Sequence, residues 1–175
     1  VAGPAYHDGI IYIGGSDGNM YAYRVEKISE GTFNFEFEWK RELGSKIWST
    51  ASVFNDILIF GSLDHWVYGL DVNNGDTVWK YETGGAIASP PLVEDGTAYV
   101  GSFDSTFYAI NAESGKEKWR FTESSNWYWG KPIFFEGYVY AASLDGKIYA
   151  LESLTGNKKW ESVTDRPIVG SPTVV

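Results

Sequence analysis

A segment of about forty residues recurs four times along the chain, and this repeat restricts the possible folds more than any other feature. Its conserved positions in the third and fourth copies are Pro91, Gly96, Tyr99, Asp104, Tyr108 and Gly115, and then Pro132, Gly137, Tyr140, Asp145, Tyr149 and Gly156. A tryptophan closes each copy, at Trp39, Trp79, Trp119 and Trp160. Self-similarity at this period predicts an array of units that bury their cores only against each other.

Each copy has the pattern of four short β-strands separated by turns. In the third copy we expect these strands at about 89–94, 97–103, 106–112 and 116–122. Asp-Gly pairs at 17–18 and 145–146 indicate tight hairpins between the second and third strands. Four antiparallel strands within about forty residues make one propeller blade. The sequence therefore predicts an all-β fold, a β-propeller of four-stranded antiparallel blades.

The repeat boundaries place four blades at about 1–43, 44–84, 85–124 and 125–164. Residues 165–175 begin a fifth copy, because 169–175 repeat the pattern of the chain's first residues. A ring closed by four blades would have no use for two first strands, so we expect a larger propeller of about seven or eight blades. The alternative is a four-bladed ring with a swapped or redundant strand.

The first copy is seven residues longer than the others, around Glu26–Phe33. The additional residues fall between the third and fourth strands of the blade. We expect a longer, partly exposed loop there, with extended flanking strands as a further possibility.

Two motifs resemble those of a known family. The segments Tyr-Val-Gly-Ser-x-Asp-x-x-x-Tyr-Ala at 99–109 and Ala-x-Asn-x-x-Ser-Gly-Lys-Glu-x-Trp at 109–119 resemble the pyrroloquinoline-quinone-type β-propeller repeat and its tryptophan-docking motif. The resemblance implies that Trp39, Trp79, Trp119 and Trp160 pack on the neighbouring blade. It is stronger to outer-membrane assembly lipoproteins than to quinoprotein dehydrogenases. It also implies an extracytoplasmic location, whether periplasmic, cell-surface or secreted.

Charge and composition argue against several classes of function. Fourteen basic and twenty-three acidic residues give a net charge of −9, which disfavours binding to nucleic acid. The sequence contains no run of 18 apolar residues, so we expect no direct membrane insertion. The absence of cysteine excludes thiolate metal sites and cysteine nucleophiles. His7 and His65 are isolated, and the hairpin aspartates are explained by turn formation, so we predict no catalytic residues, no metal and no cofactor.

Aromatic residues on the predicted loops mark a candidate binding face. The hairpins between second and third strands and the connections between blades should lie on the same face of the propeller, and there Trp48 and Trp129 replace the small residues of other copies. The candidate residues are Lys46, Trp48, Trp66, Asn126, Trp127, Tyr128, Trp129 and Arg166. The alternative is structural: Trp48 and Trp129 would plug the channel or pack under a loop, and Trp66 with His65 would do likewise.

Three functions remain open at this point. The first is a non-catalytic scaffold or binding module for protein partners. The second is a fragment of a quinoprotein dehydrogenase, although the adjacent cysteine pair of those enzymes is missing and no calcium-binding triad can be assigned. The third is recognition of a carbohydrate or other small ligand by the same loop aromatics.

Overall fold

The computed structural model describes residues 2–173, which form sixteen β-strands and, within that range, no helix. The strands make four separate four-stranded sheets, each ordered as in the sequence, with antiparallel neighbours. The predicted all-β fold of four-stranded antiparallel blades is therefore confirmed. No helix able to cross a membrane occurs in the described part of the chain.

The four sheets, called blades 1 to 4 below, have the following strands. Blade 1 contains β1 (Ala5–His7), β2 (Ile10–Gly14), β3 (Asn19–Ser29) and β4 (Thr32–Glu42). Blade 2 contains β5 (Ser52–Phe54), β6 (Ile57–Gly61), β7 (Trp66–Asp71) and β8 (Thr77–Glu82). Blade 3 contains β9 (Leu92–Glu94), β10 (Thr97–Gly101), β11 (Phe107–Asn111) and β12 (Glu117–Phe121). Blade 4 contains β13 (Ile133–Phe135), β14 (Tyr138–Ala142), β15 (Lys147–Glu152) and β16 (Lys158–Val163).

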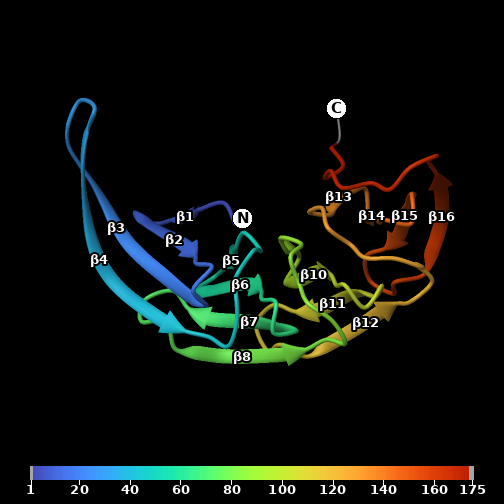
Figure 1. The fold of residues 1–175 in the computed structure, drawn as a ribbon, viewed down its shortest axis with the longest axis horizontal. Coiled ribbons are helices and arrows are strands. Elements are labelled where there is room, and N and C mark those ends of the chain that lie inside the picture. Colours follow the sequence, from blue (N-terminus) through green and yellow to red (C-terminus); the bar gives the residue numbers. More distant parts are fainter. Residues whose placement is uncertain (1, 174–175) are drawn as a thin grey trace.

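The blades follow one another around an arc (Figure 1). The short first strand of each blade lies on the inner side of the arc, and the fourth strand lies on the outer side. Residues 164–173 leave blade 4 along the path that the other connections between blades take, and the Ser171 hydroxyl accepts a hydrogen bond from the Lys131 backbone N–H at 2.9 Å. The first strand of a fifth blade was expected within residues 169–175; residues 169–173 form no strand, and residues 174–175 lie outside the described residues.

The hydrophobic core is divided among the junctions between adjacent blades. At the junction of blades 2 and 3, the Trp79 indole N–H donates a hydrogen bond to the Ala112 carbonyl at 3.0 Å. Trp39 and Trp119 make the same bond to Val72 and Ser153, the equivalent residues of the next blade, each at 2.9 Å. Three of the four repeat tryptophans thus pack on the following blade, where burial of an indole with its N–H satisfied is favourable.

Glycine makes room for each docked indole. A Cβ atom added to Gly115 would lie 2.7 Å from the Trp79 ring, and Gly115 has a positive φ of 69°. Gly75 and Gly156 lie in the same way against Trp39 and Trp119. The repeated glycine between the third and fourth strands therefore forms both a turn and a seat for the tryptophan of the preceding blade.

Trp160 occupies the equivalent position in blade 4 but has no following blade to pack on among the described residues. Its side chain is 44% exposed, whereas Trp119 is 8% exposed. It contacts Tyr140 of its own sheet, with ring centroids 5.7 Å apart, and lines a shallow recess with Pro172. The implied docking of Trp160 is thus not seen in the described structure.

Blade 1 carries a long β-hairpin in place of the expected loop. The additional residues extend β3 and β4 to eleven residues each, and the resulting arm, residues 25–37, projects from the arc (Figure 1). Cross-strand pairing places Tyr23 opposite Phe37 and Val25 opposite Phe35, so these side chains share one face of the arm. Phe33, Phe35 and Phe37 are all more than half exposed.

Candidate binding face

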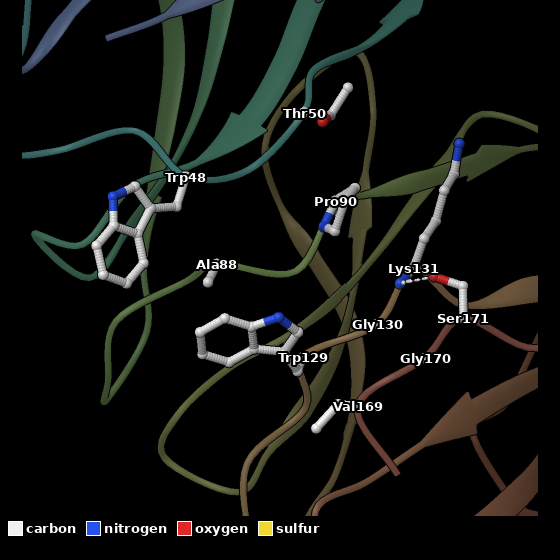
Figure 2. A pocket seen from close by; sticks show the side chains of 10 residues that line it. All are labelled: Trp48, Thr50, Ala88, Pro90, Trp129, Gly130, Lys131, Val169, Gly170 and Ser171. Carbon is white, nitrogen blue, oxygen red and sulfur yellow. Dashed lines mark hydrogen bonds between the residues drawn. The ribbon is translucent and has the colours of Figure 1, made fainter. Parts of the chain in front are cut away.

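Equivalent positions of the four repeats build the inner wall of the arc in two rows. The first row contains Trp48, Ala88, Trp129 and Val169, and the second contains Thr50, Pro90, Lys131 and Ser171. With Gly130 and Gly170 these residues line a cavity of about 370 Å³, which we call the channel cavity (Figure 2). Its chemistry follows from the repeat, because each connection between blades contributes one residue to each row.

Trp48 and Trp129 face each other across Ala88. The two indoles project into the same opening, with Ala88 between them (Figure 2), and their ring centroids are 6.4 Å apart at a tilt of 53°. Ala88 is buried, whereas Trp129 remains 39% exposed. A small residue in the intervening repeat therefore allows two tryptophans from non-consecutive connections to form one aromatic wall that solvent still reaches.

Phe103 extends this aromatic wall on the loop side. Its ring is stacked between Trp127, at 4.5 Å and 11°, and Trp129, at 5.5 Å and 17°. Trp127 is 45% exposed, so its outer ring face is free for contact. We call Trp48, Phe103, Trp127 and Trp129 the aromatic ladder.

Phe103 is absent from the residues that the sequence suggested, although a signal for it existed. It stands in the hairpin between β10 and β11, and its N–H binds the Ala86 carbonyl of the preceding connection at 2.9 Å. Leu63 and Leu144, the equivalent hairpin residues of blades 2 and 4, make the same contact with Lys46 and Trp127. Any residue at this repeat position is therefore held beside the connection, and an aromatic there joins the loop aromatics.

Tyr128 does not belong to the face, which corrects the sequence-based assignment. It is 1% exposed and packs against Phe107 and Tyr149 between blades 3 and 4. Tyr128 is the counterpart of Ile47 and Ile87, which are also buried. Each of these three residues packs closely on the glycine that ends a second strand, in this case Gly101, so the connection turns its middle side chain inward.

Trp66 is separate from the aromatic ladder. It begins β7, packs partly buried against the core shared by blades 1 and 2, and carries the Lys80 ammonium over its ring at 4.3 Å. This cation–π contact and the partial burial give Trp66 a structural role at the outer part of the junction. None of the ring contacts described for residues 2–173 links it to Trp48 or Trp129.

The polar members of the candidate face are exposed, and their backbones frame the connections. The Lys46 carbonyl accepts the Leu63 N–H at 3.0 Å, and the Arg166 carbonyl accepts the Thr164 hydroxyl at 2.7 Å. The Asn126 carbonyl accepts the hydroxyl of Ser124 at 2.8 Å. Hydrogen bonds from backbone N–H and hydroxyl groups to these carbonyls therefore fix the path of the connections that carry the exposed polar side chains.

An aspartate in each hairpin fixes the rim of this face. Asp145 accepts the Tyr149 hydroxyl at 2.6 Å and the Lys147 N–H at 3.0 Å, and Asp104 and Tyr108 form the same pair, also at 2.6 Å. Partial burial alone would raise the pKa of Asp145, but the hydrogen bonds from Tyr149 and backbone N–H groups outweigh it and lower that pKa. These carboxylates form the hairpin turns of their own blades and also hold the preceding connection, since Asp104 accepts the Gly84 N–H at 2.7 Å and Asp145 accepts the Ser125 N–H at 3.2 Å.

The channel cavity does not fit a quinone cofactor held by calcium. Carboxylates and amides are the side chains that would hold calcium, and none lines this cavity, whose one charged side chain is the cation Lys131. Among residues 2–173 no three His, Cys, Asp or Glu side chains lie close enough to bind a metal ion. The aromatic wall could support a planar ring, but the donor set for the accompanying ion is missing from the described residues.

Comparison with known proteins agrees with the geometry. Residues 25–173 match the model of the family described as outer membrane protein assembly factor BamB. The chain belongs to the BamB family. No curated protein matches the sequence.

Solved structures share the fold at low sequence identity. BamB from Moraxella catarrhalis superposes with a TM-score of 0.78 and 23% identity over 97% of this chain. A quinohemoprotein alcohol dehydrogenase from Pseudomonas putida superposes equally well, at 0.78, with 18% identity over 95% of the chain. A computationally designed protein reaches a TM-score of 0.71 with 15% identity over 97% of the chain. The chain covers 54%, 34% and 64% of these three proteins, respectively.

Proposed function

We propose that this BamB-family chain is a non-catalytic scaffold outside the cytoplasm, and that it binds a protein partner through the aromatic ladder. The supporting observation is the stack of Trp127, Phe103 and Trp129, in which large rings are exposed on rigid loops. Exposed aromatics held in place lose little conformational entropy on binding and are enriched among residues that dominate interface energies. The family description, an assembly factor, supports a protein partner in the cell envelope.

The arrangement of the blades supports membership in a larger propeller. Blade 4 presents Trp160 and Tyr140 on a face that is covered in blades 1 to 3, and the arc of blades is open (Figure 1). A further blade on this face would supply the carbonyl and glycine seat that Trp160 lacks. Such a ring would present the aromatic ladder beside equivalent loops of other blades.

Site-specific photocrosslinking in cells tests the binding role. A benzophenone amino acid at Trp127 should yield a discrete protein adduct, because Trp127 is exposed at the end of the ladder. The matched control places the same group at Leu154, which is 87% exposed in the turn between β15 and β16, away from the ladder. Discrete adducts from Leu154 but none from Trp127 would refute the assignment of this face.

A further inference from the structure

The channel cavity is too small for a folded surface and large enough for a short segment. Its volume of about 370 Å³ falls at the lower end of the usual range for small-ligand sites. A protein partner lying on the aromatic ladder can therefore enter it only with a side chain or a chain terminus. The chemistry of the lining then decides which group that is.

The apolar part of the cavity suits a ring. Trp48 and Trp129 form a tilted pair on one side, and Ala88 and Pro90 complete the apolar lining beside them (Figure 2). Aromatic walls of this kind bind proline or aromatic side chains, because ring faces pack on them without needing polar partners. The second row, in contrast, is polar.

The polar part of the cavity suits one carboxylate. The Lys131 side chain extends away from both indoles, toward the opposite side of the cavity (Figure 2). Within residues 2–173 no carboxylate forms an ion pair with it, and it is the one charged side chain of the lining. At a net charge of −9 the protein as a whole repels anions, but this repulsion is screened within about 8–10 Å at physiological salt, so the local cation decides.

The same lining is poorly suited to a sugar. Its side-chain hydroxyls, Thr50 and Ser171, already accept backbone N–H groups from Gly3 at 2.8 Å and Lys131 at 2.9 Å. No Asn, Gln, Asp or Glu side chain is among the lining residues to bind the many hydroxyls of a carbohydrate. Each of these two hydroxyls offers only its O–H as a donor, so most hydroxyls of a carbohydrate would find no side-chain partner in the lining, which costs binding energy.

We propose that the channel cavity binds a peptide end of the protein partner, with a proline or aromatic ring packed against the solvent-accessible side of the Trp48–Trp129 pair and the terminal carboxylate on Lys131. This inference rests on the proposed function, since the partner must first lie on the aromatic ladder. The ring and the terminal carboxylate must lie apart in the ligand, because the Lys131 side chain extends away from both indoles (Figure 2). Lys131 is a binding residue here, and the site performs no chemistry.

A pair of blocked tripeptides provides the test. Acetyl-Gly-Pro-Phe with a free carboxylate is titrated into the 15N-labelled protein, and the indole N–H signals are followed by NMR; the same peptide as a C-terminal amide is the matched ligand. We expect the signals of Trp48 and Trp129 to shift and those of the docked Trp79 and Trp119 to stay. The amide should bind about fivefold more weakly, the size expected for a solvent-accessible ion pair.

Two variants separate the ring from the charge. Lys131→Gln should weaken the acid peptide about fivefold and leave the amide unchanged, and 1 M salt should reduce the wild-type preference for the acid. Trp129→Ala should weaken both peptides about tenfold or more. Trp66→Ala, outside the cavity, should change neither affinity.

Several outcomes would overturn the proposal. Equal affinities for the acid and the amide peptide would show that Lys131 does not bind the carboxylate. Unshifted Trp48 and Trp129 indole signals at millimolar peptide would show that the cavity does not bind the peptide. Binding of maltotriose or of pyrroloquinoline quinone at these indoles, without peptide binding, would assign the cavity to another ligand. If photocrosslinking at Trp127 still yields a protein adduct when any of these results is obtained, the proposed scaffold function is retained. Only the peptide-binding proposal is then rejected.

Discussion

Trp119 and Trp160 occupy the same position of consecutive repeats and have opposite environments. Trp119 is 8% exposed, with its N–H on the Ser153 carbonyl and its ring over Gly156. Trp160 is 44% exposed and rests on Tyr140 of its own blade. The repeat sequence thus supplies the tryptophan side chain, but that side chain stabilises the fold only where a following blade buries it.

The receiving face of blade 1 differs from those of the other blades. Val25 is the counterpart of Val72, because each donates its N–H to the turn between the first and second strands of its own blade. In blade 1, however, Val25 pairs with Phe35 inside the arm, and the glycine seat is replaced by continuing strand. A tryptophan arriving at blade 1 would meet phenylalanine rings instead of the seat formed by Gly75, Gly115 or Gly156.

The largest expected effect is the loss of a docked indole. Trp119→Ala should lower the free energy of unfolding by about 3–5 kcal/mol, since it removes a buried ring and its hydrogen bond and leaves a cavity. Trp160→Ala should cost about 1 kcal/mol, because nearly half of that side chain is already in water. Urea denaturation measures both, and equal losses would contradict the comparison.

The seat should be nearly as sensitive as the indole. Gly115→Ala should cost about 2–4 kcal/mol, because the new Cβ would lie 2.7 Å from Trp79 at a positive φ of 69°. Gly137 is a matched control, with φ of 80° and no atom within 4 Å of an added Cβ, so Gly137→Ala should cost about 1 kcal/mol from backbone strain. Thermal melting of the two variants measures the difference in their loss of stability. Equal losses would show that Gly115 has no role in receiving the Trp79 indole.

High pH should loosen the same junctions through tyrosine ionisation. Burial, aided by the Asp104 carboxylate, raises the pKa of Tyr108 to about 12, and burial raises the pKa of Tyr12 to about 12. A raised folded-state pKa means that the stability is fully present below pH 10 and is lost as the pH rises through about 12. Tyrosinate absorbance and melting temperature between pH 9 and 12 measure this. Ionisation of Tyr108 near pH 10 would contradict the pairing with Asp104.

The smallest effect on stability is expected on the arm. Phe35→Ser should change the free energy of unfolding by less than about 0.5 kcal/mol, because that ring is 62% exposed. The same change should reduce binding of a hydrophobic dye, since three phenylalanines form one exposed stripe. A loss of several kcal/mol would show that the arm face is covered in the intact protein.

The sequence predicted the fold well because its signals are local and repeated. Turn glycines, Asp-Gly hairpins and alternating apolar residues each occur several times, so one ambiguous copy is corrected by the others. The long β3–β4 hairpin was harder, because an insertion of polar and aromatic residues is compatible with either a loop or longer strands. Cross-strand pairing of Val25 with Phe35 favoured strands.

The candidate face was predicted only in part. Trp127 and Trp129 are exposed on the connection between blades 3 and 4, but Tyr128 between them is buried, because alternate residues of a connection point in opposite directions. Phe103 and Lys131 were missed, since each is an ordinary residue in its own repeat and gains meaning only from neighbours contributed by another repeat.

The sequence by itself determined the repeat unit, the four strands of each blade and the tryptophan that each blade offers to the next. These properties depend on residues close together in the chain. Only the tertiary structure decided which tryptophans are buried, which aromatics stack into a ladder and that one lysine lines the channel cavity. Those facts depend on contacts between residues of different repeats, such as Trp48 with Trp129, whose geometry is set by how one blade packs on another.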